Sequence, residues 1–293
     1  MTDEHPSDRD IRQAVTERYG ARARAALGEQ AAATADACCA ADADGPQPMA
    51  LQLLQLGTPE GQACSVDGAC APVDAPVDAT EDDGVWGSAL YDSQQLSDVP
   101  DAAQLAAAGC GNPTAIAELS AGEAVLDLGS GGGIDCFLAA KQVGPDGEVW
   151  GVDMTPDMVQ LARHNAEAVG ADNVRFRLGE IEDIPFTEHT FDVIISNCVI
   201  NLSTDKPQVF REAFRVLKPG GRLRVSDMVL TADLPTDERA DLEAWAGCVA
   251  GALPVEEYLN HIRAAGFSDV RADCAEETRP GITSANVTAV RPA

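Results

Sequence analysis

The residues of this chain most able to do chemistry are its cysteines. Nine occur among 293 residues. The N-terminal segment, residues 1–5, is acidic and lacks the basic and apolar regions of an export signal. We therefore expect a cytoplasmic, reducing environment, in which cysteines are buried apolar residues, soft-metal ligands or redox-active thiols rather than structural disulfides.

Three cysteines lie in sequence contexts that favour a ligand role. Cys110 stands between two glycines, Cys198 directly follows a predicted strand and Asn197, and Cys248 lies within the small-residue segment 245–252. Small neighbours permit close approach of another group to the thiol. A single cysteine is nevertheless more often a small buried apolar residue, so their spacing alone leaves both interpretations open.

The other cysteines give weaker indications. For Cys136 and Cys274 we favour buried apolar residues. Five residues separate Cys64 from Cys70, which is not a usual zinc spacing, so we expect a flexible thiol pair or two idle cysteines.

A glycine loop follows the apolar run 124–128. The glycines form a Gly-x-Gly-x-Gly pattern that begins at Gly129, with Asp127 two residues earlier. A dinucleotide fingerprint would need a sixth-position glycine, where Ile134 stands instead. The pattern resembles the S-adenosylmethionine loop of class I methyltransferases, which makes Asp127, Gly129, Ser130 and Gly131 candidate cofactor-binding residues.

Alternating strands and helices must position these residues. Further strands are predicted over 148–152, 173–178, 191–196 and 222–226, separated by helices such as 206–217. This alternation predicts an α/β fold with a doubly wound, mostly parallel sheet. The resemblance of the glycine loop implies that the sheet is of the seven-stranded methyltransferase type. The ligand should lie at the carboxyl ends of the strands.

Polar and apolar residues at successive strand ends fit such a ligand. Asp153 ends the second strand and is suited to accept hydrogen bonds from ribose hydroxyls, although it could simply cap the next helix. Met154 follows it, Ile181 and Glu182 follow the third strand where adenine would lie, and Asn197 would face the methionine end.

The flanking segments suggest three parts. A helix is expected over 7–30, and residues 57–84 have linker composition. Strand-like runs at 268–273 and 284–290 predict an antiparallel edge. We expect a cysteine-bearing N-terminal arm over 1–85, an S-adenosylmethionine-binding domain over 86–230, and an extension over 231–293 that completes the sheet.

The net charge of −28, with a pI near 4.2, is extreme. Repulsion of phosphates disfavours nucleic acid and anionic membranes as partners. No apolar run reaches the roughly 18 residues of a membrane span. Lysine occurs only at positions 141, 206 and 218. A surface so acidic and poor in lysine predicts a halophilic protein, with an ordinary acidic enzyme as the alternative.

Several motifs in register over about residues 90–270 resemble the arsenite S-adenosylmethionine methyltransferase family. The most specific is Asn-Cys-Val-Ile-Asn-Leu at 197–202. The others are Gly-Cys-Gly-Asn-Pro at 109–113, the glycine loop through Cys136, Gly-Val-Asp-Met-Thr at 151–155, and the segments 179–185 and 245–252.

The resemblance implies that Cys110, Cys198 and Cys248 bind trivalent arsenic, a thiophilic centre, beside the methyl donor. The arsenic lone pair would attack the methyl group without a general base. It also implies a disulfide relay between Cys110 and an N-terminal cysteine, Cys39 or Cys38, with Cys64 and Cys70 as competitors. The substrates would be arsenite and methylarsenite, with a thiol or thioredoxin-type reductant as co-substrate.

Two alternatives remain. The chain could be a non-catalytic arsenic or soft-metal sensor or chaperone, although the glycine loop with Asp153 and Asn197 would then be superfluous. It could also methylate another small-molecule acceptor, in which case the cysteines would be dispensable.

Overall fold

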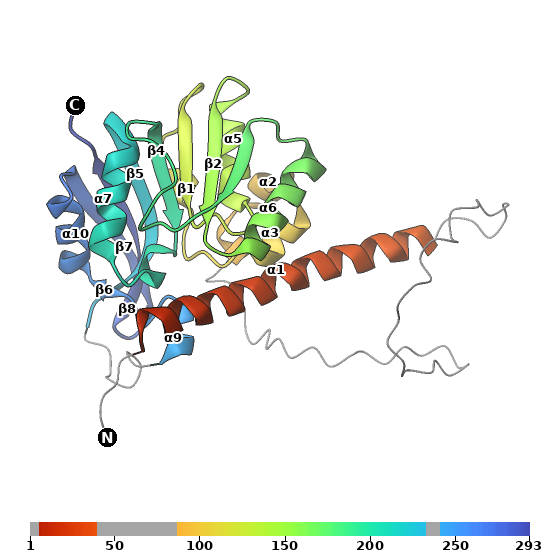
Figure 1. Ribbon diagram of the computed structural model, residues 1–293, viewed down its shortest axis with the longest axis horizontal. Coiled ribbons are helices and arrows are strands. Elements are labelled where there is room, and N and C mark those ends of the chain that lie inside the picture. Colours follow the sequence, from red (N-terminus) through yellow and green to blue (C-terminus); the bar gives the residue numbers. More distant parts are fainter. Residues whose placement is uncertain (1–5, 40–86, 233–240) are drawn as a thin grey trace.

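The computed structural model describes residues 6–39, 87–232 and 241–293, without the side chains of residues 29–39, 276, 278 and 279. Its centre is one sheet in the order β3-β2-β1-β4-β5-β8-β7, with β6 paired to β5 (Figure 1). The strands are β1 (Ala124–Leu128), β2 (Glu148–Asp153), β3 (Val174–Leu178), β4 (Phe191–Asn197), β5 (Leu217–Leu230), β6 (Leu253–Pro254), β7 (Ser268–Arg279) and β8 (Ile282–Val290).

The described helices connect and flank these strands. They are α1 (Asp8–Cys39), η1 (Gly87–Leu90), α2 (Ser93–Leu96), α3 (Asp101–Ala106), α4 (Pro113–Ile116), α5 (Ile134–Val143), α6 (Pro156–Val169), η2 (Ile200–Leu202), α7 (Lys206–Val216), α9 (Leu242–Ala246) and α10 (Val255–Ala264). Asn112 caps α4, accepting a hydrogen bond from the backbone nitrogen of Ala115 at 3.1 Å.

Successive residues of β1 bury opposite faces of the sheet. Val125 packs in the core under α5, whereas Leu126 and Leu128 pack in the core under α7 and α10. Because side chains alternate along a strand, a five-residue apolar strand buried on both sides belongs at the centre of a doubly wound sheet. Helices cover both faces, and the carboxyl ends of the parallel strands meet at one edge.

The C-terminal strands complete the sheet with an antiparallel pair. β8 runs antiparallel to both β5 and β7, and joins them over residues 282–290. The sequence predicted this antiparallel edge, and the structure confirms it. β5 is longer than predicted, running from Leu217 to Leu230, because its second half pairs with β8 and with the short strand β6.

Helix α1 crosses the carboxyl edge of the sheet (Figure 1). Ile11 and Val15 pack with Ala246 of α9, and Ala23 and Ala26 pack with α3 and α6. The helix therefore lies over the edge where the fold places a ligand. The boundaries proposed at residues 85 and 230 stay predictions, and the linker with Cys64 and Cys70 lies outside the described residues.

Candidate active site

A cavity opens where β1, β2 and β4 end. Together with the solvent-open space at its mouth it takes up about 770 Å³. The glycine loop, the ends of β2 and β4, and α1 form its walls. The predicted cofactor residues among its lining are Gly129, Gly131, Asp153, Met154, Ile181, Glu182 and Asn197.

Asp153 is held by backbone donors but keeps accepting capacity. Its Oδ2 accepts from the Gly131 nitrogen at 2.9 Å, and its Oδ1 accepts from the Thr155 nitrogen at 2.8 Å. Burial raises the pKa of the Asp153 carboxyl. The Thr155 side chain is a third hydrogen-bond donor to this carboxylate. Because a carboxylate accepts about four hydrogen bonds, one position stays open for a hydroxyl. Thr155, not Asp153, occupies the N-cap position of α6.

Two contacts hold the side chain of Glu182 at the cavity wall. Its Oε1 accepts from the Ser203 hydroxyl at 2.6 Å, and Arg12 of α1 forms an ion pair with it at 3.6 Å. Arg12 also pairs with Glu180. Ile181, 8% exposed, contributes an apolar surface between these acids.

Two predicted cofactor-binding residues, Asp127 and Ser130, are buried and do not line the cavity. Asp127 is buried and accepts a hydrogen bond from the Cys136 thiol at 3.3 Å. Ser130 is also buried, and its hydroxyl oxygen has no hydrogen-bond partner among the described residues. Neither side chain lines the cavity, so both contribute through the shape of the loop.

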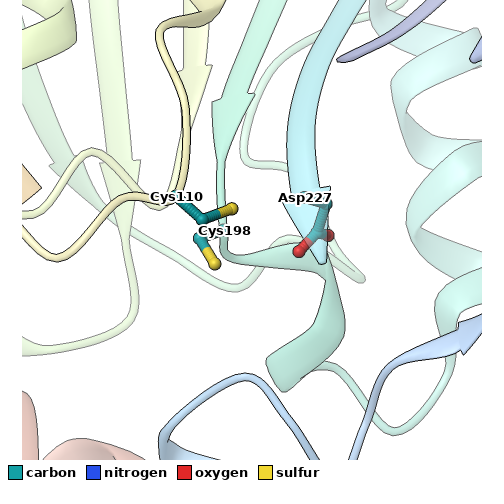
Figure 2. A group of neighbouring side chains, drawn as sticks. All are labelled: Cys110, Cys198 and Asp227. Carbon is teal, nitrogen blue, oxygen red and sulfur yellow. The ribbon is translucent and has the colours of Figure 1, made fainter. Parts of the chain in front are cut away.

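The three candidate thiols converge beside this cavity. Cys110, Cys198 and Cys248 belong to one buried cluster with Met228 and Leu230, and Cys198 also lines the cavity. The sulfurs of Cys110 and Cys198 and a carboxylate oxygen of Asp227 lie within 4.8 Å of one another (Figure 2). The Cys248 thiol donates to the backbone carbonyl of Cys198 at 2.7 Å.

The backbone brings the thiols together in two ways. Cys198 and Cys248 adopt left-handed conformations, with φ of 61° and 63°. Such angles are uncommon outside glycine and asparagine, and they turn each chain sharply at the thiol. Cys110 instead stands between two glycines whose backbone packs closely on neighbouring side chains: a Cβ at Gly109 would lie 2.3 Å from Asn197, and one at Gly111 would lie 2.4 Å from Ser226.

The thiols are held in their neutral form. Burial raises the pKa of Cys110. The pKa of Cys198 is raised chiefly by its hydrogen bond with Cys110, and that of Cys248 chiefly by its hydrogen bond with Cys198, with burial adding to both. The cluster is thus a set of protonated thiols.

Sequence reasoning missed two ionisable residues near the thiol cluster, Asp227 and Lys206. Asp227 is fully buried and accepts from Asn201 Nδ2 at 2.8 Å and from the Tyr258 hydroxyl at 3.1 Å. Burial raises the pKa of Asp227 to about 7 and lowers that of Lys206 to about 8. An acid inside the apolar strand 223–230 was the available indication, because unpaired carboxyls are rarely buried.

Asn197 differs in its contacts from what its position in the sequence suggests. Its side chain borders the cavity, but its amide is hydrogen bonded to the 109–111 segment and to Tyr91 and Asp135. Cys136 is fully buried on α5 and Cys274 is exposed on β7. Cys136 is therefore buried as predicted, whereas Cys274 is not a core residue.

The remaining predicted site residue, Cys39, is the last residue of α1, and its side chain lies outside the described part of the chain. Tyr19 of the same helix borders the cavity. Twenty helical residues span about 30 Å, so the structure does not bring Cys39 to Cys110.

Comparison with known proteins adds to this geometry. A family profile described as a methyltransferase domain matches residues 119–266. The crystal structure of an arsenic(III) S-adenosylmethionine methyltransferase from Chlamydomonas reinhardtii superposes with a TM-score of 0.59 and 35% identity, covering 68% of this chain and 72% of that one. The chain belongs to the arsenite S-adenosylmethionine methyltransferase family.

Curated arsenite methyltransferases extend the match. The protein of Halobacterium salinarum is 46% identical over 218 residues, which are 74% of this chain and 54% of that protein. The human protein is 40% identical over 156 residues, 50% of this chain and 42% of its own length. The chain thus spans about half the length of the curated arsenite methyltransferases it matches. A relative from Halobacterium fits the halophilic interpretation of the charge.

The fold is also shared with a methyltransferase of another kind. A phosphoethanolamine N-methyltransferase from Haemonchus contortus shares the fold with a TM-score of 0.55 at 17% identity, which is a likeness of fold alone.

Within the described segments, none of the helices combines the length and the apolar character that crossing a membrane requires.

Proposed function

We propose that this protein transfers methyl groups from S-adenosylmethionine to trivalent arsenic held by Cys110, Cys198 and Cys248. The observation that carries the proposal is the convergence of three buried thiols beside a cavity lined by the glycine loop and Asp153. Methyltransferase folds for carbon, nitrogen or oxygen acceptors need the cavity but not the thiols.

The cavity fits the cofactor. Asp153 retains accepting capacity for a ribose hydroxyl, and Met154 and Ile181 offer apolar surface for adenine. Gly131 has a φ of 50° and borders the cavity, so its backbone can approach a ligand without a Cβ. Bound there, S-adenosylmethionine would supply a methyl group carried on a positively charged sulfur. The lone pair of thiolate-bound arsenic would take this methyl group, leaving S-adenosylhomocysteine.

The thiol cluster suits a neutral substrate. Three protonated thiols can exchange with the three hydroxyls of arsenous acid, forming three As–S bonds and releasing three waters. No net charge enters the site, which matters because Cys198 and Cys248 are each only 2% exposed. A trigonal set of thiolates matches the softness of arsenic.

The protein contributes to methyl transfer by positioning the two reactants rather than by acid–base catalysis. Arsenic(III) carries no proton on its nucleophilic lone pair, so no base is needed at that step. Cys198 lies in both the thiol cluster and the cavity wall, which supports a site where bound arsenic would lie next to the methyl donor. Holding the reactants close together converts a bimolecular step into an intramolecular one.

We further propose that an external thiol or a thioredoxin-type protein is the reductant. Methylation formally oxidises arsenic to the pentavalent state, and two electrons from thiols must restore the trivalent state before methylarsenite can be methylated. A relay from Cys110 to Cys39 would require α1 to rearrange, because about 30 Å of helix separates Tyr19 from Cys39. A cytoplasmic, reducing location fits this requirement.

Binding measurements separate this proposal from the alternatives. We expect the purified protein to bind both S-adenosylhomocysteine and arsenite, and to form methylarsenicals when a thiol and S-adenosylmethionine are present. A sensor or chaperone would bind arsenite without turnover. A methyltransferase for another acceptor would bind the cofactor and leave arsenite unmodified.

A further inference from the structure

The side chain of Asn197 joins the two walls of the site. It stands directly before Cys198 at the end of β4, and its Oδ1 accepts hydrogen bonds from the backbone nitrogens of Cys110 at 3.0 Å and Gly111 at 3.2 Å. Although 87 positions separate Asn197 from Cys110, one amide thereby connects two of the three thiol-bearing segments.

The other end of the amide is also occupied. Nδ2 lies 2.8 Å from the carbonyl oxygen of Gly111, 2.9 Å from the Tyr91 hydroxyl and 3.1 Å from Asp135 Oδ2. The Tyr91 hydroxyl donates in turn to Asp135 Oδ1 at 2.9 Å. This environment fixes the orientation of the amide, because the two backbone N–H groups face its oxygen and the carboxylate and carbonyl face its nitrogen.

These contacts exhaust the hydrogen-bonding capacity of the side chain. A primary amide has two hydrogens to donate and two lone pairs on its oxygen. Here two N–H donors use the oxygen and three acceptors share the two hydrogens. Asn197 therefore borders the cofactor cavity without a free polar group to offer to a cofactor.

The glycines around Cys110 are shaped for this contact. A Cβ at Gly109 would lie 2.3–2.5 Å from all three atoms of the Asn197 amide group. The carbonyl of Cys110 is held from the other side by the Ser284 hydroxyl of β8 at 2.9 Å. The backbone of Cys110 is thus held at both its nitrogen and its oxygen.

We propose that Asn197 is the positioning residue that sets the distance between the Cys110 and Cys198 thiols, rather than a cofactor ligand. Tyr91 and Asp135 hold its amide in the orientation that receives the Cys110 and Gly111 nitrogens. The proposal deepens the function proposed above and rests on it for the identity of the metalloid.

The first test compares arsenite and S-adenosylhomocysteine binding in two variants. Truncation in Asn197→Ala leaves the Cys110 and Gly111 nitrogens without their acceptor, and we expect arsenite affinity to fall by about tenfold or more. S-adenosylhomocysteine affinity should change by less than about threefold, since no hydrogen bond to it is lost. The cofactor-site variant Asp153→Ala should show the reverse pattern. Loss of S-adenosylhomocysteine binding in Asn197→Ala, with arsenite binding retained, would overturn the proposal.

A double-mutant cycle tests whether Asn197 acts through Cys110. Once Cys110→Ser has removed the thiol, adding Asn197→Ala should weaken arsenite binding little further. Fully additive losses would show that Asn197 acts by another route. Tyr91→Phe removes one hydrogen bond of the network and should move arsenite affinity in the same direction by a smaller factor, which keeps the test available if Asn197→Ala folds poorly.

A third measurement does not depend on arsenic. Amide hydrogen exchange of Cys110 and Gly111 should accelerate by about tenfold or more in Asn197→Ala, because both amides lose their acceptor. Exchange in β1 should be unchanged. Unaltered exchange at Cys110 and Gly111 would contradict the proposal even if the protein never bound arsenite, whereas faster exchange in a protein that binds no arsenite would reject only the proposed substrate.

Discussion

The thiol of Cys248 donates a hydrogen bond to the backbone carbonyl of Cys198 at 2.7 Å, and both residues have left-handed backbones with φ of 61° and 63°. Two non-glycine residues thus adopt unfavourable conformations where their segments meet. The surrounding cluster of Cys110, Met228 and Leu230 buries the contact. Backbone strain at this point accompanies the convergence of thiols from separate parts of the chain.

This strain can be measured by comparing two small substitutions. At Cys198 we expect Cys198→Gly to be at least as stable as Cys198→Ala, since a left-handed backbone disfavours an L-residue with a Cβ by about 1 kcal/mol. At Cys136, which is helical in α5, the order should be the usual one, with alanine more stable than glycine by about 1 kcal/mol. Denaturant unfolding gives both differences, and a more stable Cys198→Ala would refute the strain.

The glycine loop predicts a second pair of variants. Gly129 has a φ of 70°, and a Cβ there would lie 2.4 Å from the Val199 side chain. Gly129→Ala should therefore lose stability and cofactor affinity. Gly170 has a φ of 64° with open space around it, so Gly170→Ala should lose only the backbone term of about 1 kcal/mol and bind S-adenosylhomocysteine normally. Equal binding by the two variants would show that the loop tolerates a side chain.

Stability should depend on pH through buried Asp227. Its pKa is raised to about 7 by burial, so between pH 4 and 7 the folded protein binds a proton that the unfolded chain has released. Between about pH 4 and 7 the free energy of unfolding should therefore fall as pH rises, by up to ~1.4 kcal/mol per pH unit. Below this range the group costs no stability.

Asp227→Asn should reduce this dependence. The amide oxygen can still accept from Asn201 and the Met228 nitrogen, while its NH2 can donate to the Tyr258 hydroxyl. Denaturant unfolding at several pH values from 5 to 8 should show a shallower fall in the free energy of unfolding with rising pH for the variant. Parallel curves for the two proteins would mean that Asp227 does not titrate in this range.

The charge of the chain predicts a requirement for salt. A net charge of −28 repels itself in dilute buffer, whereas at 1 M ionic strength the screening length falls to about 3 Å. We expect the melting temperature to rise on going from 0.1 M to molar potassium chloride. Ion pairs such as Lys218 with Asp192 are screened by the same salt and give a smaller opposite effect. A melting temperature that falls steadily with salt would contradict the halophilic interpretation.

The sequence was sufficient to predict the architecture but not the internal contacts of the site. Asp127 and Gly129 mark a buried strand and turn whose form follows from local residue types. The role of Asn197 depends on the segment around Cys110, which approaches it only through the folded sheet. Asp227 was missed because a single acid in an apolar strand does not indicate which groups surround it. The periodicity of apolar residues predicts the helices, the strands and the edges of the sheet. The hydrogen-bond partners of a side chain depend on tertiary packing, which this periodicity does not specify.

The most direct test of the central proposal is turnover in molar salt with S-adenosylmethionine, arsenite and a thiol, followed by separation of methylated from inorganic arsenic. The wild-type chain should form methylarsenicals, and Cys198→Ser should form none while still binding S-adenosylhomocysteine. The exposed Cys274→Ser serves as the thiol control and should retain turnover. Methylarsenicals from Cys198→Ser at the wild-type rate, or none from a wild-type protein that binds S-adenosylhomocysteine, would contradict the proposal.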